Sequence, residues 1–233
     1  AKYRYDALQL RVDKRFSGDK AAFGGLTLVF SYTFSKNMQS ANYLNNWNYL
    51  HEEPVHELVG YDKPQNIAVS GVWGLPFGRG RYFLKHSNKV LTGIAGGWTM
   101  NWSYRFTSGN PVAGINAVNK CGTLLVDDQT HGRQWNNTSS CWAGNPSYMP
   151  RVVEDRYAWL RQMDNVTTNL AAAKEFGVTE RVKLQLRGEA FNLLNHVIYK
   201  PANTTYNNVD FGKLSIEQQN FPRQIQVSAK LRF

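Results

Sequence analysis

The sequence predicts an all-β protein, an antiparallel up-and-down transmembrane β-barrel segment of about seven to eight long strands that is incomplete as a barrel. Three observations predict it. Apolar and polar residues alternate along several segments, these segments are longer than ordinary strands, and the connections between them differ in length in a regular way. The 12 Tyr, 12 Phe and 7 Trp favour strands joined by polar loops over a helical bundle.

Each strand is identified by alternation with a period of two, because successive side chains of a strand point to opposite faces. The predicted strands run to about 10–14 residues, whereas ordinary strands average about 5–6 and a tilted strand needs about 9–11 to cross a bilayer. An eighth strand is predicted around 210–217. The seven clearest segments are 8–16, 26–35, 65–75, 94–107, 164–176, 181–192 and 225–233.

The connections between these strands alternate between short and long. Residues 17–25, 76–93 and 177–180 form the shorter connections, and residues 36–64, 108–163 and 193–221 form the long ones. In an up-and-down sheet, alternate connections lie at the same end, so all the long ones share one end. This asymmetry is typical of outer-membrane barrels, which have short periplasmic turns and long outside loops.

An odd number of strands also carries information, because bacterial single-chain barrels have an even number from eight upward. An open sheet edge in lipid leaves backbone groups unsatisfied. We therefore expect either the eighth strand or a larger barrel. The chain starts with Ala1 and lacks a signal peptide, which favours the expectation that residues 1–233 are the C-terminal part of a larger barrel.

The polar faces of the predicted strands contain full charges, which a barrel directs into its lumen. There they would contact a plug or attract anionic ligands. Lys14 and Lys174 are the exceptions that fall on apolar faces, near the short-connection ends, where a lysine can extend to the headgroups. The residues predicted to face the lumen are Arg11, Arg15, Arg105, Lys183, Arg187, Glu189, Lys230 and Arg232.

The net charge of +10 is spread along the chain, and no Lys/Arg block or nucleic-acid motif is present. Nucleic acid is therefore not an expected partner, while an anionic membrane surface or ligand fits the charge. Cys121 and Cys141 lie in one loop and suggest a disulfide in an oxidising compartment, worth about 3 kcal/mol in the chain-entropy model. The alternative is two unrelated free thiols.

The sequence contains no recognisable catalytic motif, so we expect no enzyme, no cofactor and no metal site. The stretch HEEPVHE is not HExxH, and Pro54 disfavours the helix that would align its histidines. Flat rings in the long loops could hold a sugar or an aromatic chelate, or could serve loop packing and interface anchoring. The candidate ligand-contacting rings are Trp47, Trp135, Trp142 and Trp159.

Six segments in order resemble the C-terminal barrel region of the Oar-like group of TonB-dependent outer-membrane transporters. They are YDALQLRVDKRFSG, LTLVFSYTFSKNM, GVWGLPFGRGRYFL, GGWTMNWSYRFTSGNPV, RVKLQLRGEAFNLLNH and FGKLSIEQQNFPRQIQVSAKLRF. The resemblance covers nearly the whole chain except the two longest loops. It implies a 22-stranded barrel with an N-terminal regulatory-like domain and a plug, which this chain does not contain.

The resemblance also implies partners. The TonB system would act through the absent N-terminal region, and the plug and the remaining strands would complete the barrel within outer-membrane lipid. The terminal strand resembles the signal that the barrel-assembly machinery reads, here Phe233 with Leu231 behind it.

The function expected first is the barrel portion of an active-uptake receptor in the bacterial outer membrane, with a siderophore, glycan or peptide as ligand. The alternatives are a passive porin or adhesin-type barrel and a secreted carbohydrate-binding β-sandwich.

Overall fold

Seven long strands form the main sheet of the protein. The computed structural model describes residues 2–16, 22, 24–40, 56–115, 117–123, 135, 140–144 and 156–233. The sheet follows the order β1-β2-β4-β5-β10-β11-β12, and the short strand β3 pairs with β2. These strands are β1 (Lys2–Phe16), β2 (Gly25–Ser40), β3 (His56–Leu58), β4 (Gln65–Gly74), β5 (Trp98–Thr107), β10 (Asn165–Gly177), β11 (Lys183–Phe191) and β12 (Gln224–Arg232).

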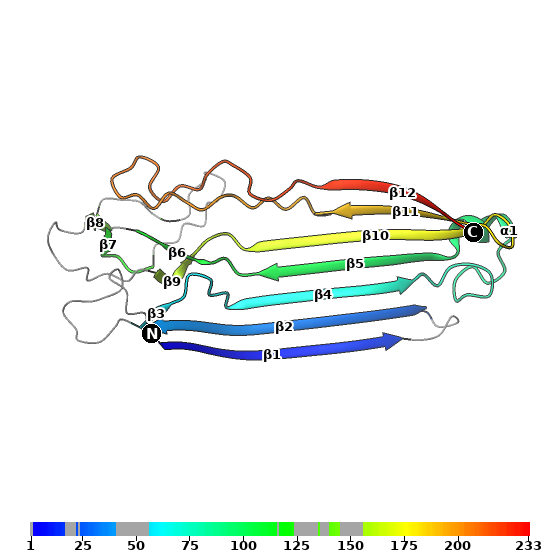
Figure 1. The fold of residues 1–233 in the computed structure, drawn as a ribbon, viewed down its shortest axis with the longest axis horizontal. Coiled ribbons are helices and arrows are strands. Elements are labelled where there is room, and N and C mark those ends of the chain that lie inside the picture. The colour runs from blue at the N-terminus through cyan, green and yellow to red at the C-terminus, as the bar shows by residue number, and fades with distance from the viewer. Residues whose placement is uncertain are drawn as a thin grey trace.

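All pairs of neighbouring long strands are antiparallel, as the period-two pattern predicted. Figure 1 shows them side by side, with the C-terminus at the end where the short connections lie and the N-terminus at the other. The four small strands β6 (Pro111–Ala113), β7 (Ala117–Asn119), β8 (Trp142–Gly144) and β9 (Arg156–Arg161) all lie at the long-connection end (Figure 1). The predicted sorting of long and short connections is therefore confirmed.

The register gives the sheet one apolar and one polar face, because residues directly opposite each other in antiparallel strands share a face. One row across the sheet is Leu10, Tyr32, Ile67, Phe106 and Val166. The next row, on the other face, is Arg11, Ser31, Ala68, Arg105 and Thr167. The alternation read within single strands therefore continues in phase from strand to strand.

The apolar face is not covered by a second sheet within the described part of the chain. Leu8 is 66% exposed and Phe34 51% exposed, and on β12 Val227 is 79% exposed. A β-sandwich would bury this face against another sheet. The structure therefore corrects the β-sandwich alternative, and an apolar face of this size matches a hydrocarbon solvent.

Gly71 leaves space for a large aromatic ring on the neighbouring strand. Gly71 of β4 lies opposite Trp102 of β5 on the apolar face. A Cβ atom added to Gly71 would come within 2.3 Å of the Trp102 ring. The glycine thus makes room for the indole to lie flat over the strand.

The connection between β4 and β5 differs from the prediction. Residues Lys89–Ala95 form the helix α1, capped by Asn88, whose side chain accepts a 2.8 Å hydrogen bond from Leu91 N. The strand predicted to start at residue 94 therefore starts at Trp98. Ile94 continues the period of two by coincidence, because one apolar residue at a boundary fits both a helix and a strand. No helix among the described residues is long and apolar enough to cross a membrane.

The strand predicted around 210–217 does not form. This segment makes only isolated bridges, such as Asn203 with Phe211. Phe211 and Leu214 are three residues apart and both point into a buried core, which strand alternation would prevent. The described long-strand count therefore stays at seven.

A water-excluding core lies among the long connections. We call the described residues of 56–64, 108–164 and 192–223 the cap. Pairing of β6 with β9 and of β7 with β8 gives it two small sheets. Its core unites the β5–β10 and β11–β12 connections, and consists of Val112, Ile115, Ala117, Trp135, Trp142, Leu160, Ala202, Phe211 and Leu214.

Candidate ligand site at the long-connection end

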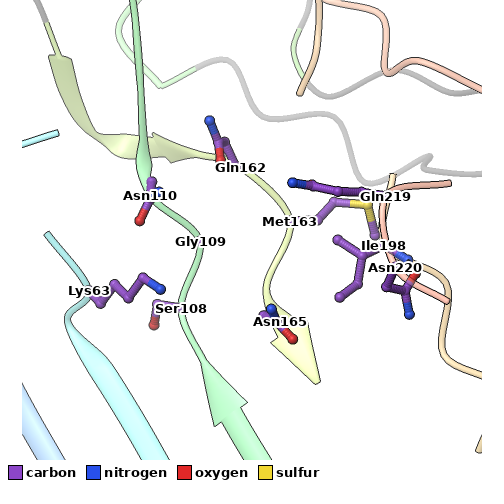
Figure 2. A pocket seen from close by; sticks show the side chains of 10 residues that line it. All are labelled: Lys63, Ser108, Gly109, Asn110, Gln162, Met163, Asn165, Ile198, Gln219 and Asn220. Carbon is purple, nitrogen blue, oxygen red and sulfur yellow. Dashed lines mark hydrogen bonds between the residues drawn. The ribbon is translucent and has the colours of Figure 1, made fainter. Parts of the chain in front are cut away.

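A cavity of about 360 Å³ opens where β4, β5 and β10 meet the cap. Figure 2 shows Lys63 and Ser108 on one side, Ile198 and Asn220 on the other, and Met163 and Asn165 between them. Residues far apart in sequence thus surround one space. The remaining lining residues are Gly109, Asn110, Gln162 and Gln219.

Most of the lining is amide and hydroxyl, with one cation and no carboxylate. The Lys63 ammonium forms no ion pair with any described residue. The side-chain Oδ1 of Asn110 is buried and has no hydrogen-bond partner in the described structure. The cavity therefore offers a positive charge and a lining of amide and hydroxyl groups to a polar ligand.

The strand ends hold the cavity wall in place. Ser108 N donates to Gln65 O at 2.9 Å, and Gln65 N donates to the Ser108 hydroxyl at 3.2 Å. Gly109 N donates to the Asp164 carboxylate at 2.9 Å. A Cβ atom on Gly109 would lie 1.9 Å from Gln162 O, so only glycine allows these two segments to approach.

A buried ion pair joins the cap to the sheet next to the cavity. Arg161 of β9 contacts Asp62 at 2.6 Å, and the Asp62 side chain is only 1% exposed. Arg161 also donates to Asp62 O and Gly109 O, while Asp62 accepts from Asn37 N of β2 at 2.8 Å. Because the carboxylate and guanidinium have several partners, this pair holds β2, β9 and the cavity wall together.

A second ion pair repeats the arrangement at the other end of β9. Arg156 contacts Glu57 of β3 at 3.1 Å, with side-chain exposures of 18% and 7%. Gln39 of β2 also donates to Glu57, at 3.1 Å. Glu57 belongs to the HEEPVHE stretch, and in the structure it acts as a partner for Arg156. No cluster of metal-binding side chains occurs in the described ranges, while 51–55 lie outside them.

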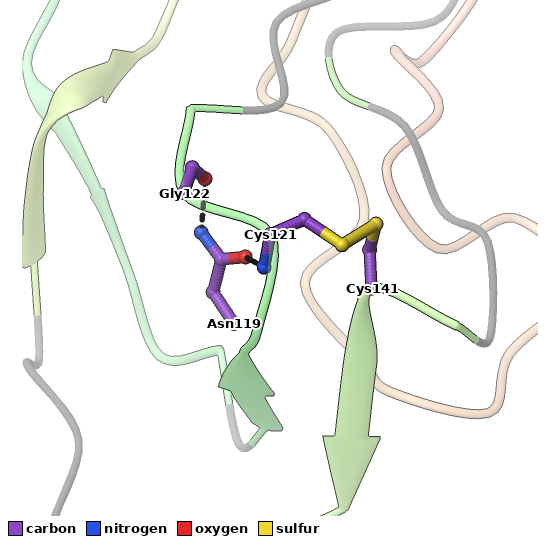
Figure 3. Close-up of a disulfide and its surroundings, with 4 residues drawn as sticks. All are labelled: Asn119, Cys121, Gly122 and Cys141. Carbon is purple, nitrogen blue, oxygen red and sulfur yellow. Dashed lines mark hydrogen bonds between the residues drawn. A yellow bond between two sulfur atoms is a disulfide. The ribbon is translucent and has the colours of Figure 1, made fainter.

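Cys121 and Cys141 form a disulfide with an S–S distance of 2.03 Å (Figure 3). It joins the end of β7 to the start of β8, and Lys120 N adds a 2.8 Å hydrogen bond to Cys141 O. The Asn119 side chain accepts from Cys121 N at 3.0 Å and donates to Gly122 O (Figure 3). The bridge therefore closes the small β7–β8 sheet within the cap.

Two of the tryptophans predicted to contact a ligand lie in the cap core instead. Trp135 is 0% and Trp142 1% exposed, and both rings meet Phe211 edge-on, at 5.6 and 5.4 Å between centroids. A buried ring cannot present a face to a ligand, so the packing alternative holds for this pair. Trp159 packs against Tyr157 and does not line the cavity, and Trp47 lies outside the described residues.

The residues predicted to face the lumen share the polar face of the sheet. Arg11 and Arg105 lie in one row, and Arg15 lies in the row of Glu189 further along. Lys183 lies opposite Arg232, and Lys230 opposite Gln185. Arg187 contacts Glu189 at 2.6 Å. Their function in a lumen stays a prediction.

The two residues predicted as an assembly signal are accessible. Leu231 shares the apolar face with Leu184 and is 55% exposed, and Phe233 is 96% exposed. Recognition by assembly machinery stays a prediction.

The cavity was missed because sequence reasoning examined charges and rings. A signal was present in the polar residues just outside the strands, in TSGN (107–110) and QMDN (162–165). Such residues at strand ends meet at one edge of an antiparallel sheet. Their meeting with Asn220 depends on the fold of a long connection, which no periodicity encodes.

The comparisons with known proteins give one match. A family model described as "Outer membrane beta barrel domain" matches residues 1–226. Neither the curated proteins nor the solved structures contain a match to the chain. The match spans the sheet up to the first residues of β12 and leaves out residues 227–232 of that strand, and it agrees with the uncovered apolar face. The chain belongs to the outer membrane β-barrel domain family, whose place is the bacterial outer membrane.

Proposed function

We propose that the chain is the barrel portion of a TonB-dependent receptor, with its long-connection end facing the cell exterior and the cavity as part of the ligand site. The observation that carries this proposal is a sheet with two free edges beneath a folded cap. The edges indicate a larger barrel, and the cap supplies a preorganised binding surface. No catalytic activity is part of the proposal.

The edges are formed by β1 and β12, which do not pair with each other in the described structure. An open edge in hydrocarbon leaves a row of backbone N–H and C=O groups unsatisfied, which costs several kcal/mol for each group. Further strands must therefore complete the barrel. A wide barrel is the kind that encloses a plug, which is the partner that couples a receptor of this class to TonB.

The cavity suggests the class of ligand. Its volume of about 360 Å³ falls in the range of small-molecule sites, roughly 300–1,000 Å³. Lys63 and the surrounding amides fit a ligand with a carboxylate, a phosphate or several hydroxyl groups. The ligand's closest contacts would be Lys63, Asn110, Asn165 and Asn220.

A passive barrel is the second candidate, and the charge of the polar face favours it. Seven Lys and Arg side chains were assigned to this face, and their acidic neighbours are Asp13, Glu175 and Glu189. An excess of positive charge around a lumen suits an anion-conducting pore. The two candidates differ in whether the lumen is closed.

The test is to insert the full-length protein into planar lipid bilayers and to measure conductance. A receptor with a plug should give no steady current, and deletion of the plug should open a conductance. A steady anion-selective current from the intact protein would overturn the receptor proposal in favour of the passive barrel. Growth of the native host on the ligand should also be lost on TonB depletion, as energised uptake requires.

A further inference from the structure

The connector between β4 and β5, residues 75–97, combines basic and apolar side chains and contains no Asp or Glu. Its cations are Arg79, Arg81, Lys85 and Lys89. Its large apolar residues are accessible even though they lie next to a folded sheet. These are Tyr82, Phe83, Leu84, Val90, Leu91 and Ile94, with exposures of 44%, 44%, 40%, 70%, 43% and 67%.

The connector's helix α1 lies on the apolar side of the sheet. Lys174 lies opposite Trp98 and Leu186, which places its side chain on the apolar face. Its Nζ atom donates to Gly93 O and Ile94 O at the end of α1, and the residue is only 5% exposed. Trp98 Nε1 also donates to Ile94 O, at 2.9 Å. Two side chains of the lipid-facing surface thus hold the helix against it.

Lys174 was expected to extend to the headgroups from the short-connection end. In the structure it lies over the Phe176 ring at 4.9 Å and the Trp98 ring at 5.8 Å, and it ends at the helix carbonyls. A cation at the C-terminal end of a helix is favourable because the last carbonyls carry partial negative charge. The lysine therefore fixes α1 at the rim of the hydrocarbon.

The accessible apolar residues of α1 point away from the protein. Val90 and Ile94 are four residues apart and Leu91 adjoins them, so they form one stripe of the helix. Because Lys174 and Trp98 hold the other side of α1 against the barrel exterior, this stripe faces the membrane. In water such a stripe would be unfavourable, whereas at the boundary of acyl chains and headgroups it is stabilising.

Three of the connector's four cations lack acidic partners among the described residues. Arg79, Lys85 and Lys89 form no ion pair within the described structure. Lys85 lies over the Tyr82 ring at 5.5 Å, which leaves its charge available. The two other short connections, 17–24 and 178–182, have no such surplus, because Asp19 adjoins Lys20 in the first and Glu180 adjoins Arg181 in the second. The charge is therefore specific to the connector that carries the helix.

We propose that residues 75–97 form an interfacial anchor that binds anionic phospholipid headgroups of the bilayer. Val90, Leu91 and Ile94 insert at the upper acyl chains, while Arg79, Lys85 and Lys89 contact the phosphates. Backbone hydrogen bonds preorganise the surface, including Phe83 N to Pro76 O at 2.9 Å. The inference rests on the family and the apolar face, and it holds whether the barrel is a receptor or a passive pore.

The first experiment measures insertion. A single cysteine replaces Ile94 in the full-length protein, carries an environment-sensitive fluorophore, and is reconstituted in phosphatidylcholine vesicles with or without brominated acyl chains. The matched control carries the label at Val178, which is 59% exposed in the turn between β10 and β11. Strong quenching at residue 94 and little at residue 178 is expected. Equal quenching at both positions, or none at residue 94, would overturn the proposal and would point to a protein partner or to water.

The second experiment measures headgroup preference with spin-labelled phosphatidylglycerol and phosphatidylcholine around the reconstituted protein. The wild type should enrich the anionic lipid, and each of Arg79→Gln, Lys85→Gln and Lys89→Gln should reduce that enrichment roughly fivefold at low salt. Lys230→Gln on the polar face is the charge-matched control and should leave it unchanged. Heat-dependent gel mobility identifies folded protein, so only folded variants are compared. Undiminished enrichment in a variant that combines all three substitutions contradicts the proposal.

Discussion

We call the seven long strands the wall. The wall directs its apolar side chains outward, whereas the cap directs them into a core. On the wall, Leu8, Phe34 and Ile225 point outward and are 66%, 51% and 74% exposed. In the cap, Trp135 and Leu160 point inward and are 0% exposed. One chain thus folds in two solvents, hydrocarbon around the wall and water around the cap. The outward side is apolar in hydrocarbon, and the inward side is apolar in water.

The ion pairs show the same difference. Arg161–Asp62 and Arg156–Glu57 in the cap are nearly buried, whereas Lys183–Glu175 on the polar face of the wall has exposures of 57% and 35%. Burial removes the screening of water, so that a pair becomes costly to break. The wall is held chiefly by its backbone ladder, and the cap by a few specific side chains.

The largest expected effect is the loss of the Asp62 carboxylate. Asp62→Ala removes a buried ion-pair partner of the Arg161 guanidinium and the acceptor of Asn37 N, which should destabilise the cap by about 3–5 kcal/mol. Hydrogen exchange measured by mass spectrometry should rise in residues 105–115 and 156–163 and stay unchanged in β11 and β12.

Asp210→Ala is the matched control, because Asp210 is 61% exposed and pairs with Lys213 at 3.0 Å in the same cap. It should change exchange little, since exposed pairs contribute only about 0–1 kcal/mol. If the two variants behaved alike, burial would not be what distinguishes the cap.

A smaller effect is expected from a charge placed on the lipid side of the wall. Val69 lies on the apolar face opposite Phe30, and Ser70 lies on the polar face opposite Val29 and Ser103. Val69→Arg should lower barrel stability by about 2–4 kcal/mol, because it puts a charge near the middle of the membrane. Ser70→Arg should be tolerated.

The measurement is the folded fraction of the two Arg variants of the full-length protein, read from heat-dependent gel mobility. Leu186 would be a poorer position, because it lies directly opposite Lys174 and any effect would include repulsion between like charges. Equal folded fractions would mean that the two faces are assigned wrongly.

The sequence was sufficient for the wall, since alternation alone identified the strands and their faces. It was insufficient for the cap, because a tryptophan in a core and a tryptophan that contacts a ligand are the same letter in the sequence. Trp135 and Trp142 are distinguished only by their burial in the structure. The same holds for α1: Ile94 fits a strand or a helix until the Asn88 cap and Lys174 are seen. Local periodicity predicts the regular elements. The cavity forms where segments distant in sequence pack together, which local periodicity does not predict.

A still smaller effect is expected at Glu175, where the wall has its own charge cluster. Glu175 contacts Lys183 at 3.0 Å and Arg232 at 3.5 Å across β10, β11 and β12. Glu175→Gln should lower the free energy of unfolding by only about 0.2–1 kcal/mol, because the groups remain accessible to water. Urea unfolding in lipid vesicles measures it. A loss comparable to that of Asp62→Ala would remove the distinction between wall and cap pairs.

The smallest effect is expected from pH at an exposed pair of the cap. A hydrogen bond from Lys200 lowers the pKa of Glu217 below its ordinary value, and the opposite charge acts in the same direction. The folded-state pKa then lies below the unfolded one, so the pair's contribution to stability is present above the unfolded pKa and is lost as pH falls through the folded pKa.

Hydrogen exchange of residues 198–200 should therefore rise slightly on acidification in the wild type, after correction for the intrinsic rate. It should rise less in Glu217→Gln, whose pair is absent at every pH. The backbone bond from Lys200 N to Glu217 O, at 3.1 Å, holds the two segments together in both proteins, which keeps the difference small. An equal rise in both proteins would contradict a contribution of this pair to the acid response.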